Sequence, residues 1–571
     1  MNFSLKNYLK LYKLQVILGP FFKFLEAVSD VISPFLVALI LDVGIPNNDK
    51  QYILTMSLIV IAMNILGFVF AIICQKCSAL ACQGIGKNIR KDMYTKITTL
   101  SSREMDKYTT MSFTNRCVSD VAQVQTAVGM TIRQVSRAPF LLIGSAVLAM
   151  IIDVKLSSIF LLIMPFILLV FFVIMKRTTP LFSETKIDLD NLSNVTRENL
   201  SGNRVVRAFN KQDYEKQRFD KSNKKYINVN LKVGAYSAML QPLLSLIVNM
   251  GIVAVVYFGG FQVNIGGLTQ GQIISLINYL TQIAASLVVV ARLIITYTRT
   301  GASIKRIKEV FSLENSVKEI KQPLKIENQQ MPTIEFKNVS FSYNGFKDAL
   351  KNFNLTIKQG ETIGIIGGTG SGKSSLVNLL PRFYDVSEGE ILIDGKNIKD
   401  YELNQLRDIV SIVPQNPTLF TGTIESNLKF RKSNATEAEL KKALILSQSY
   451  EFVMEKPDGI KSKVERGGRN FSGGQRQRLT IARAIVGEPK ILILDDSSSA
   501  LDFQTDFNLR KALNHILKNT TKIYVSQRTN SIKQADKIVV LDAGEVVGVG
   551  VHSELLKNCA VYKEIYDSQN S

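Results

Sequence analysis

The feature that most constrains this chain is a series of six long apolar runs within its first three hundred residues. The runs cover residues 17–43, 53–79, 138–152, 156–175, 239–260 and 271–296. Most of them approach the ~20 residues that a helix needs to cross ~30 Å of hydrocarbon, although the third is short unless residues 131–137 extend it. We therefore predict a membrane domain of six transmembrane helices. The first run is far longer than the core of a signal peptide, so we expect it to remain as the first span.

Basic residues are unevenly distributed along the chain, whose net charge is +21 and whose residues are 46% hydrophobic. The connections after the second and fourth runs are rich in them: Lys87, Arg90, Lys91, Lys96, Arg103, Lys107, Arg116, Arg133 and Arg137, then Lys176, Arg177, Arg204, Arg207, Lys224 and Lys225. The other connections contain only Lys50 and Lys155. Since positive residues stay on the cytoplasmic side, we predict a multi-pass protein of the cell inner or plasma membrane with both termini cytoplasmic. The charge is thus a topology signal, and we expect no nucleic-acid partner.

The two basic connections are too long to be mere links, and their periodic apolar patterns predict helices. We expect the transmembrane helices to continue well beyond the bilayer into these cytoplasmic segments. The short sequences 112–116 and 198–202 would then form the turns furthest from the membrane. A soluble domain could bind at these two turns.

Several ionisable and amide side chains interrupt the apolar runs. Lys23, Glu26 and Asp30 follow helical spacing and so lie on one face of the first span. Because charges at membrane depth are costly, that face should look into a cavity or a partner helix. A local ion pair between Lys23 and Glu26 and a site that attracts cationic substrates both remain open. The candidate substrate-pathway residues are Glu26, Asp30, Asn249, Asn278, Gln282 and Arg292.

The pattern of apolar and polar residues changes after the sixth run. Residues 314–332 are polar, contain Pro323 and Pro332 and show no apolar period, which predicts a linker. Short apolar strands then alternate with helical patterns, as in a soluble α/β domain. The predicted boundaries are 1–313 for the membrane domain, 314–332 for the linker and 333–571 for the α/β domain. No internal repeat is visible, so any two-fold arrangement must come from a second chain.

A glycine-rich loop follows the apolar run 362–366 and precedes the helical pattern 375–380. Its residues fit the phosphate-loop spacing G-x-x-x-x-G-K-[ST]: Gly367, Gly368, Thr369, Gly370, Ser371, Gly372, Lys373 and Ser374, with Ser375 next. Glycines let successive backbone N–H groups turn toward a nucleotide's phosphates, because a Cβ there would block the approach. Lys373 would reach the β- and γ-phosphates, and Ser374 would ligate Mg²⁺. The loop therefore predicts that the chain binds ATP or GTP.

Further motifs follow this loop. The apolar strand pattern 491–495 ends in Asp495, where a second magnesium contact is needed. Phe471 precedes it, together with Ser472, Gly473, Gly474 and Gln475. After it come Ser499, Ala500, Leu501 and Asp502. With these motifs nearly the whole chain resembles the ABC transporter family, in particular exporter half-transporters with six spans fused ahead of one nucleotide-binding domain.

The resemblance implies roles for the matching positions. Tyr343 matches the aromatic residue that stacks on adenine, and Gln415 matches the glutamine that approaches the magnesium, so the implied cofactors are ATP and Mg²⁺. Residues 472–475 match the signature, which binds the γ-phosphate of a nucleotide held by the opposite subunit; Phe471 stands before it where leucine is usual. Residues 499–502 match a loop that crosses the dimer interface. The two cytoplasmic turns match the coupling helices that dock on the nucleotide-binding domains.

Two positions depart from the family pattern. Asp496 occupies the place of a glutamate that polarises the attacking water, and its side chain is one methylene shorter. A general base must lie within hydrogen-bond reach of the water it activates. Gln527 occupies the place of the switch histidine, and the chain's two histidines, His515 and His552, lie elsewhere. The two departures together predict a degenerate catalytic site.

The predicted fold is a membrane α-helical domain of six transmembrane helices with long cytoplasmic extensions, followed by an α/β P-loop ATPase domain. We interpret the chain as one half of a heterodimeric exporter of amphiphilic small molecules, such as drugs or lipid-like compounds. Its expected partners are a second, non-identical half-transporter, membrane lipid and the amphiphile. A homodimeric lipid or drug flippase with slow turnover is the alternative within the family. An ATP-gated channel or regulatory subunit is the alternative from another functional class.

Overall fold

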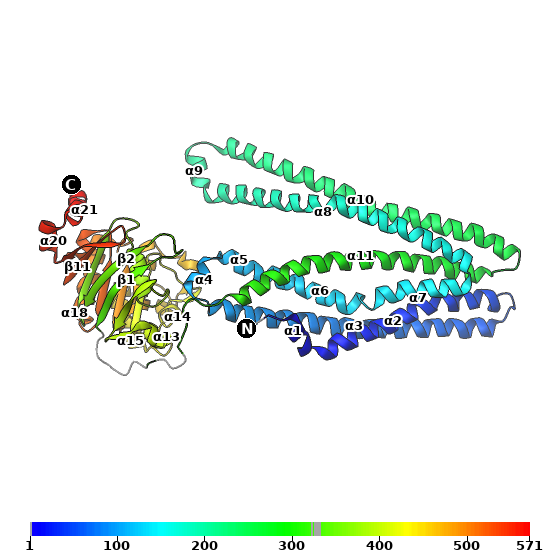
Figure 1. Cartoon of the computed structure of the whole chain (residues 1–571), viewed down its shortest axis with the longest axis horizontal. Coiled ribbons are helices and arrows are strands. Elements are labelled where there is room, and N and C mark those ends of the chain that lie inside the picture. The colour runs from blue at the N-terminus through cyan, green and yellow to red at the C-terminus, as the bar shows by residue number, and fades with distance from the viewer. Residues whose placement is uncertain (1–2, 321–323, 325–332, 571) are drawn as a thin grey trace. The chain divides into compact units, whose positions relative to one another are not determined.

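The computed structural model describes residues 3–320, 324 and 333–570 of the chain (Figure 1). Contacts divide the chain into two compact units, one made of Met1–Thr98 with Thr110–Ser312 and the other of Thr99–Thr109 with Leu313–Ser571. The first unit is helical, and the second combines helices with β-sheets. The predicted linker lies largely outside the described residues, and its boundaries stay a prediction.

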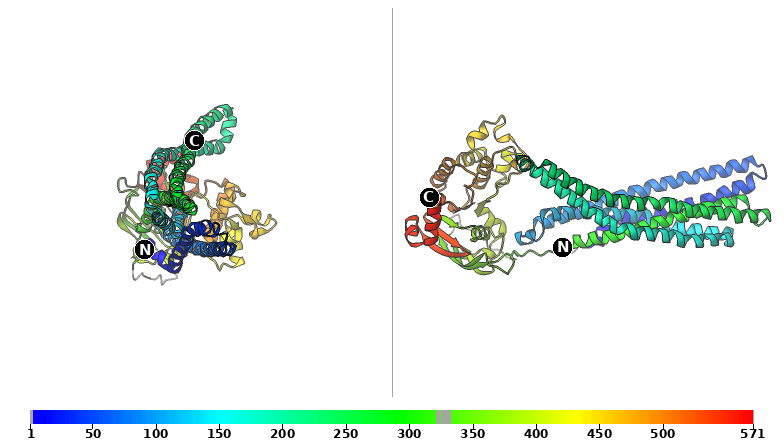
Figure 2. Two further views of the ribbon diagram at one scale, coloured as in Figure 1. Left: turned by 90° about the vertical axis from the view of Figure 1, so that its right-hand side faces the viewer. Right: turned by 90° about the horizontal axis from the view of Figure 1, so that it is seen from above.

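The first unit is built from long helices. Its elements are α1 (Leu5–Leu11), α2 (Lys13–Leu39), the π-helix η1 (Ile40–Gly44), α3 (Lys50–Thr98), α5 (Thr110–Asn115), the π-helix η2 (Arg116–Asp120), α6 (Val121–Gln134), α7 (Arg137–Ile152), α8 (Val154–Ser201), α9 (Asn203–Ala208), α10 (Gln212–Asn264) and α11 (Gln270–Ser312). Helices α8 and α10 run side by side and are joined by α9, while α2 and α3 form another close pair (Figures 1 and 2).

Six helical segments among the described residues are long and apolar enough to cross a membrane, which confirms the predicted number. They are Lys13–Gly44, Lys50–Thr98, Thr110–Ile152, Val154–Ser201, Gln212–Asn264 and Gln270–Ser312. The third segment is not short, because α6 leads into α7 and supplies the residues that the apolar run lacks. Each segment also exceeds its apolar run, as expected for helices that continue beyond the bilayer.

The turn between the second and third spans differs from its predicted position. Residues 112–116 are helical, in α5 and η2, and Phe113 is buried. The chain turns instead through the short helix α4 (Ser102–Asp106), where the Ser101 hydroxyl donates to the Glu104 carboxylate one turn later. That serine–glutamate spacing is typical of a helix start, and the prediction overlooked it. The second turn lies close to its predicted place, since α8 ends at Ser201 and α9 follows directly.

The second unit contains a six-stranded sheet of order β12-β11-β3-β10-β9-β6, a four-stranded sheet of order β2-β1-β4-β5 and the pair β7-β8. The strands are β1 (Ile334–Phe341), β2 (Leu350–Ile357), β3 (Thr362–Gly367), β4 (Glu388–Ile393), β5 (Lys396–Asn397), β6 (Val410–Val413), β7 (Gly422–Thr423), β8 (Lys463–Val464), β9 (Ile491–Asp495), β10 (Thr521–Val525), β11 (Lys537–Asp542) and β12 (Glu545–Gly550). Strands β3, β10 and β9 are parallel neighbours, so their carboxyl ends meet at one edge of the sheet.

Helices surround these sheets. They are α12 (Lys373–Leu379), α13 (Leu403–Ile409), α14 (Ile424–Leu428), α15 (Glu437–Leu446), α16 (Tyr450–Met454), α17 (Gly473–Ile485), α18 (Phe503–Ile516), α19 (Thr529–Ile532), α20 (His552–Asn558) and α21 (Ala560–Asn570), with 3₁₀ turns η3 (Ile398–Asp400), η4 (Gly459–Lys461) and η5 (Arg466–Gly468). Along β9, Leu492 and Leu494 pack into one hydrophobic core, and Ile491 and Ile493 pack into another. Strand β9 is therefore buried on both faces, which explains why its sequence is a continuous apolar run as far as Asp495.

Replacement of Ile493 by alanine should destabilise the second unit, because its side chain is fully buried in the strand that ends at Asp495. We expect Ile493→Ala to lower the free energy of unfolding by about 2–5 kcal/mol, the usual cost of emptying such a site. Ile445→Ala is the matched control, since that side chain is 47% exposed on α15. Denaturant unfolding of the purified chain measures both, and equal losses would contradict the assigned core.

Candidate nucleotide-binding site

The glycine loop joins the buried strand β3 to α12, as the spacing predicts. A Cβ at Gly367 would lie 2.1 Å from the Leu541 carbonyl oxygen, so only glycine fits there. Gly372 has a φ of 96°, and a Cβ on it would lie 2.4 Å from the Ala349 carbonyl oxygen. Gly370, by contrast, faces open space among the described residues, which leaves room for a ligand against the loop backbone.

Lys373 folds back over this loop. Its ammonium group donates to the carbonyl oxygens of Gly367 at 2.9 Å and Gly368 at 2.6 Å. Burial lowers the pKa of Lys373, while the neighbouring Asp496 and Asp495 act in the opposite direction. A phosphate group would give this cation an anionic partner in place of neutral carbonyls, and charge-assisted hydrogen bonds are the stronger kind.

Asp495 and Ser374 bring two oxygen ligands together. The Ser374 hydroxyl donates to Asp495 Oδ1 at 3.3 Å, and the carboxylate is buried at the end of β9. Burial raises the pKa of Asp495, the Ser374 hydrogen bond lowers it and Asp496 raises it further. A cation at this point would favour the ionised carboxylate. Hydroxyl and carboxylate oxygens beside a phosphate loop are the ligands that Mg²⁺ prefers, so the residues present fit that ion.

Asp496 adopts a left-handed backbone conformation with a φ of 42°. Its N–H donates to the Val525 carbonyl oxygen at 2.9 Å, which attaches it to the neighbouring strand β10. The Gln415 amide donates to Asp496 Oδ2 at 3.5 Å. Burial raises the pKa of Asp496, against the effects of Arg528 and Lys373. The carboxylate at this position therefore lies beside the predicted magnesium residues.

Tyr343 lines the same pocket as the phosphate loop and contacts the residue that follows it. Its hydroxyl is 3.1 Å from the Ser375 hydroxyl, and its ring makes edge contacts with Phe341 and Tyr384. The Tyr384 hydroxyl in turn donates to Asp106 of α4 at 2.6 Å. Within the second unit, helix α4 is thus connected through two tyrosines to Ser375 at the start of α12.

One pocket of about 560 Å³ gathers most of the predicted nucleotide-site residues. Those that line it are Tyr343, Thr369, Gly370, Gly372, Lys373, Ser374, Ser375, Gln415, Asp495, Asp496 and Gln527. Gly367, Gly368 and Ser371 are not among the lining residues, and Gly367 and Ser371 form the buried base of the loop. Sequence reasoning missed the lining residues Asn344, Phe346, Lys347, Asp348 and Ala349. The polar turn directly after Tyr343 was the signal that could have found them.

The signature residues lie elsewhere in the second unit. Ser472 is exposed and caps α17, where its hydroxyl accepts from the Gln475 N–H at 3.2 Å while Gln475 accepts from the Ser472 N–H. A Cβ on Gly474 would lie 3.1 Å from the Ala500 carbonyl oxygen, so the signature adjoins the predicted interface loop. Among the described residues that line the nucleotide pocket, none comes from either motif.

An unpredicted residue holds the loop that carries Gln527. The Gln569 side chain on α21 donates to the Gln527 carbonyl oxygen at 2.6 Å and accepts from the Thr529 N–H at 2.9 Å. Helix α21 therefore holds the backbone at Gln527, the predicted switch position. No local sequence pattern links residues so far apart in the chain.

Known proteins resemble the chain over both units. The family model described as the ABC transporter transmembrane region matches residues 16–287, and the model described as ABC transporter matches residues 350–499. An uncharacterized ABC transporter ATP-binding protein of Bacillus subtilis, YfiB, is 33% identical over 564 residues, which cover 99% of this chain and 98% of that protein. This chain belongs to the ABC transporter family.

A second relative with a named function and a solved structure also resemble the chain. An ATP-dependent lipid A-core flippase of Desulfotalea psychrophila is 31% identical over 562 residues, which cover 98% of this chain and 97% of the flippase. A bacterial Atm1-family ABC exporter solved with ATP bound matches with a TM-score of 0.79 at 23% identity, over 100% of this chain and 99% of that one. The predicted fold class is confirmed: the ABC transporter has an Atm1-family exporter fold, and its nucleotide-binding domain makes it an ATPase-coupled transporter.

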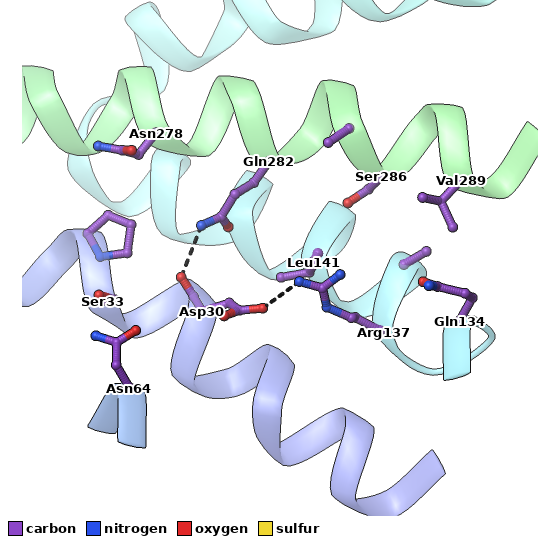
Figure 3. Close-up of a pocket in the computed structure, with 13 residues that line it drawn as sticks. Asp30, Ser33, Asn64, Gln134, Arg137, Leu141, Asn278, Gln282, Ser286 and Val289 are labelled. Carbon is purple, nitrogen blue, oxygen red and sulfur yellow. Dashed lines mark hydrogen bonds and ion pairs between the residues drawn. The ribbon is translucent and has the colours of Figure 1, made fainter. Parts of the chain in front are cut away.

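Five of the six candidate substrate-pathway residues of this ABC transporter line two cavities of the first unit. Asp30, Asn278 and Gln282 line a cavity of about 410 Å³ between α2, α7 and α11 (Figure 3). Asn249 and Arg292 line a second cavity of about 470 Å³. Glu26 is not among the lining residues of either and forms an ion pair with Lys23 at 2.6 Å. The local ion pair considered from the sequence is therefore present.

Replacement of Asp495 by asparagine should weaken magnesium binding and, at the same time, stabilise the nucleotide-free protein. Because burial raises its folded-state pKa, ionised Asp495 destabilises the nucleotide-free protein at neutral pH, and this cost disappears as the pH falls through the raised pKa. We therefore expect Asp495→Asn to raise the apparent unfolding temperature without nucleotide, and to reduce the extra stabilisation that Mg²⁺ adds to ATP. Thermal unfolding with and without Mg²⁺ measures both effects.

Asp502 provides a control of opposite sign. Hydrogen bonds from Thr505 lower the pKa of Asp502, so the ionised carboxylate stabilises the fold at neutral pH and that contribution is lost on acidification. We expect Asp502→Asn to lower the apparent unfolding temperature slightly at neutral pH. A destabilised Asp495→Asn variant at neutral pH would contradict the described environment of Asp495.

Proposed function

We propose that this chain is one half of a heterodimeric ABC exporter whose own site binds ATP with Mg²⁺ and hydrolyses it slowly. The proposal depends on one observation: Asp496 and Gln527, which replace the family's glutamate and histidine, both line the nucleotide pocket. The remaining parts for binding are present in that pocket, namely the phosphate loop, Asp495 and Gln415. A homodimer would contain two copies of the same altered site, which favours an unlike partner.

The shorter carboxylate explains slow hydrolysis. An aspartate places its oxygens about 1.5 Å nearer its own backbone than a glutamate would, one carbon–carbon bond less of reach. In the structure Gln415 already lies within 3.5 Å of the Asp496 carboxylate. Phosphoryl transfer needs the attacking water to be oriented in line with the phosphate. A site whose carboxylate is withdrawn would therefore still bind the nucleotide but would not position the water.

The signature serves the partner in this proposal. Ser472 is exposed at the start of α17, with the N-terminal N–H groups of that helix beside it. A helix N-terminus with a serine cap is suited to an anion such as a γ-phosphate. The nucleotide that presents this γ-phosphate would be held by a second subunit, whose own site would carry the competent base. Asp495, Ser374 and Gln415 would hold Mg²⁺ at this chain's site.

We further propose that the protein lies in the inner or plasma membrane with both termini cytoplasmic and exports an amphiphile. The basic connections after the second and fourth spans support this orientation. The homodimeric flippase remains the second candidate, because a relative that matches almost the full length is named an ATP-dependent lipid A-core flippase. Lipid-like amphiphiles suit either assembly.

Steady-state ATPase rates of the assembled transporter test which residues carry catalysis. We expect Ser472→Ala to lower the rate by ~10²–10³, as loss of a donor aimed at transition-state charge does in other enzymes. Asp496→Asn should leave most of the activity, because this carboxylate is already withdrawn. The purified chain without its partner should bind ATP and hydrolyse little of it.

Thr436→Ala is the matched control for Ser472→Ala. Thr436 caps α15 with the same reciprocal pair of hydrogen bonds, to Glu439, and does not belong to the signature. Its loss should cost about 1 kcal/mol of stability and little ATPase activity. If Asp496→Asn proves as damaging as Ser472→Ala, this chain's own site is catalytic, and the homodimeric flippase becomes the better account.

A further inference from the structure

The cavity between α2, α7 and α11 is unusually polar for a site at membrane depth. Eight of its thirteen lining residues are polar: Asp30, Ser33, Asn64, Gln134, Arg137, Asn278, Gln282 and Ser286. Figure 3 shows their side chains converging from several helices on one space. Its volume of about 410 Å³ lies in the range of ligand pockets. Polar groups inside a membrane are costly unless they have partners, so an occupant of this cavity would be favoured if it were polar.

The charges beside the cavity are already balanced. Arg137 donates to Asp30 Oδ2 at 2.8 Å, and its Nε lies 3.8 Å from Glu26. Glu26 also pairs with Lys23 at 2.6 Å. Two cations thus face two carboxylates, and neither carboxylate is left to attract a cationic ligand. This pairing disfavours the cationic-substrate interpretation of Glu26 and Asp30.

Two buried donors at the cavity lack a hydrogen-bond partner among the described residues. The Ser286 hydroxyl is one, on a side chain that is only 3% exposed. The other is the Nε–H of Arg137, since its Glu26 neighbour is too distant for a hydrogen bond. Figure 3 shows the Ser286 side chain pointing from α11 toward the α7 side of the cavity. A buried donor without a partner costs free energy, which a ligand acceptor would recover.

The cavity also offers acceptors. Asn278 donates its amide N–H to the Ile274 carbonyl oxygen at 2.9 Å, and Asn64 does the same to Val60 at 2.8 Å. Each amide therefore uses one N–H on its own helix and keeps its second N–H and its carbonyl oxygen for an occupant. Gln282 is fixed at both ends, by the Asp30 carbonyl oxygen and the Ser145 hydroxyl.

We propose that this cavity binds an uncharged, hydroxyl-rich head group of an amphiphile. Phosphate and carboxylate only accept hydrogen bonds and ammonium only donates them, whereas a hydroxyl does both. Unsatisfied donors next to free acceptors, with no net charge, match that chemistry. Leu141 and Val289 supply apolar wall for the C–H faces of such a group. As a substrate class, this inference rests on the exporter function proposed above; as a binding site, it does not.

Binding without nucleotide tests the head-group class. The full-length transporter in lipid nanodiscs is titrated with three radiolabelled probes of equal chain length: octyl glucoside, octylammonium and octyl phosphate. Empty nanodiscs correct for partition into lipid. We expect saturable binding of octyl glucoside that is tighter than that of either charged probe. Tighter binding of a charged probe, or glucoside uptake no greater than in empty nanodiscs, would overturn the proposal.

Two mild variants locate the site. Ser286→Ala and Asn278→Ala should each weaken octyl glucoside binding about threefold to tenfold, the value of one lost hydrogen bond. Ser157→Ala is the control for the serine, because that hydroxyl is equally buried and unpartnered among the described residues but lies outside this cavity. Asn249→Ala is the control for the amide, since it lines the second cavity. Equal affinities for all four variants and the unaltered chain would refute the assignment.

ATP-driven transport is measured separately on the same preparations. If octyl glucoside binds with the expected variant dependence but ATP drives no export, the proposed function fails and the head-group site stands. If export of an amphiphile is found while octyl glucoside binds no better than the charged probes, the exporter function stands and the head-group class is wrong.

Discussion

The parallel pairing of β3, β10 and β9 is the constraint on which the nucleotide site depends. Val525 of β10 lies in register with Ile365 of β3 and with Asp495 of β9. Parallel neighbours end at the same edge of a sheet, so the glycine loop, the two aspartates and the switch position emerge together. A slip of one residue would turn Asp495 to the other face of the sheet and remove it from Ser374. The buried apolar side chains on both faces prevent that slip.

Local motifs were the part of the site that the sequence could predict. The phosphate loop, the strand that ends in Asp495 and the six spans are each specified by residues adjacent in the chain, and their geometry follows from backbone sterics and apolar length. The contacts between Gln569 and Gln527, and between Arg137 and Asp30, join distant segments. No local pattern encodes such a pair, because its partners are chosen by packing. The turn through α4 was missed for another reason, since the start signal at Ser101 and Glu104 is short and was overlooked.

The backbone at position 496 gives the aspartate a physical context. A φ of 42° is uncommon for residues other than glycine, and aspartate tolerates it better than most. Its N–H is held by Val525, so the conformation belongs to the sheet edge and does not follow the side chain. A glutamate here would gain reach but lose some of that tolerance. The aspartate therefore fits the local backbone at position 496.

The nucleotide pocket and the cavity between α2, α7 and α11 differ in how their charged residues are paired. In the nucleotide pocket burial raises the pKa of both Asp495 and Asp496, with Lys373 as a neighbouring cation, so the protein leaves these carboxylates short of compensation. Such a pocket favours a ligand that brings a cation with it, as a nucleotide with Mg²⁺ does. At the cavity of the first unit Arg137 pairs with Asp30, and beside it Lys23 pairs with Glu26, so the groups left for an occupant are hydrogen-bond donors and acceptors. Desolvated charge is far costlier than a desolvated hydroxyl, so the membrane unit can present a neutral polar surface at a depth where an unpaired carboxylate could not persist.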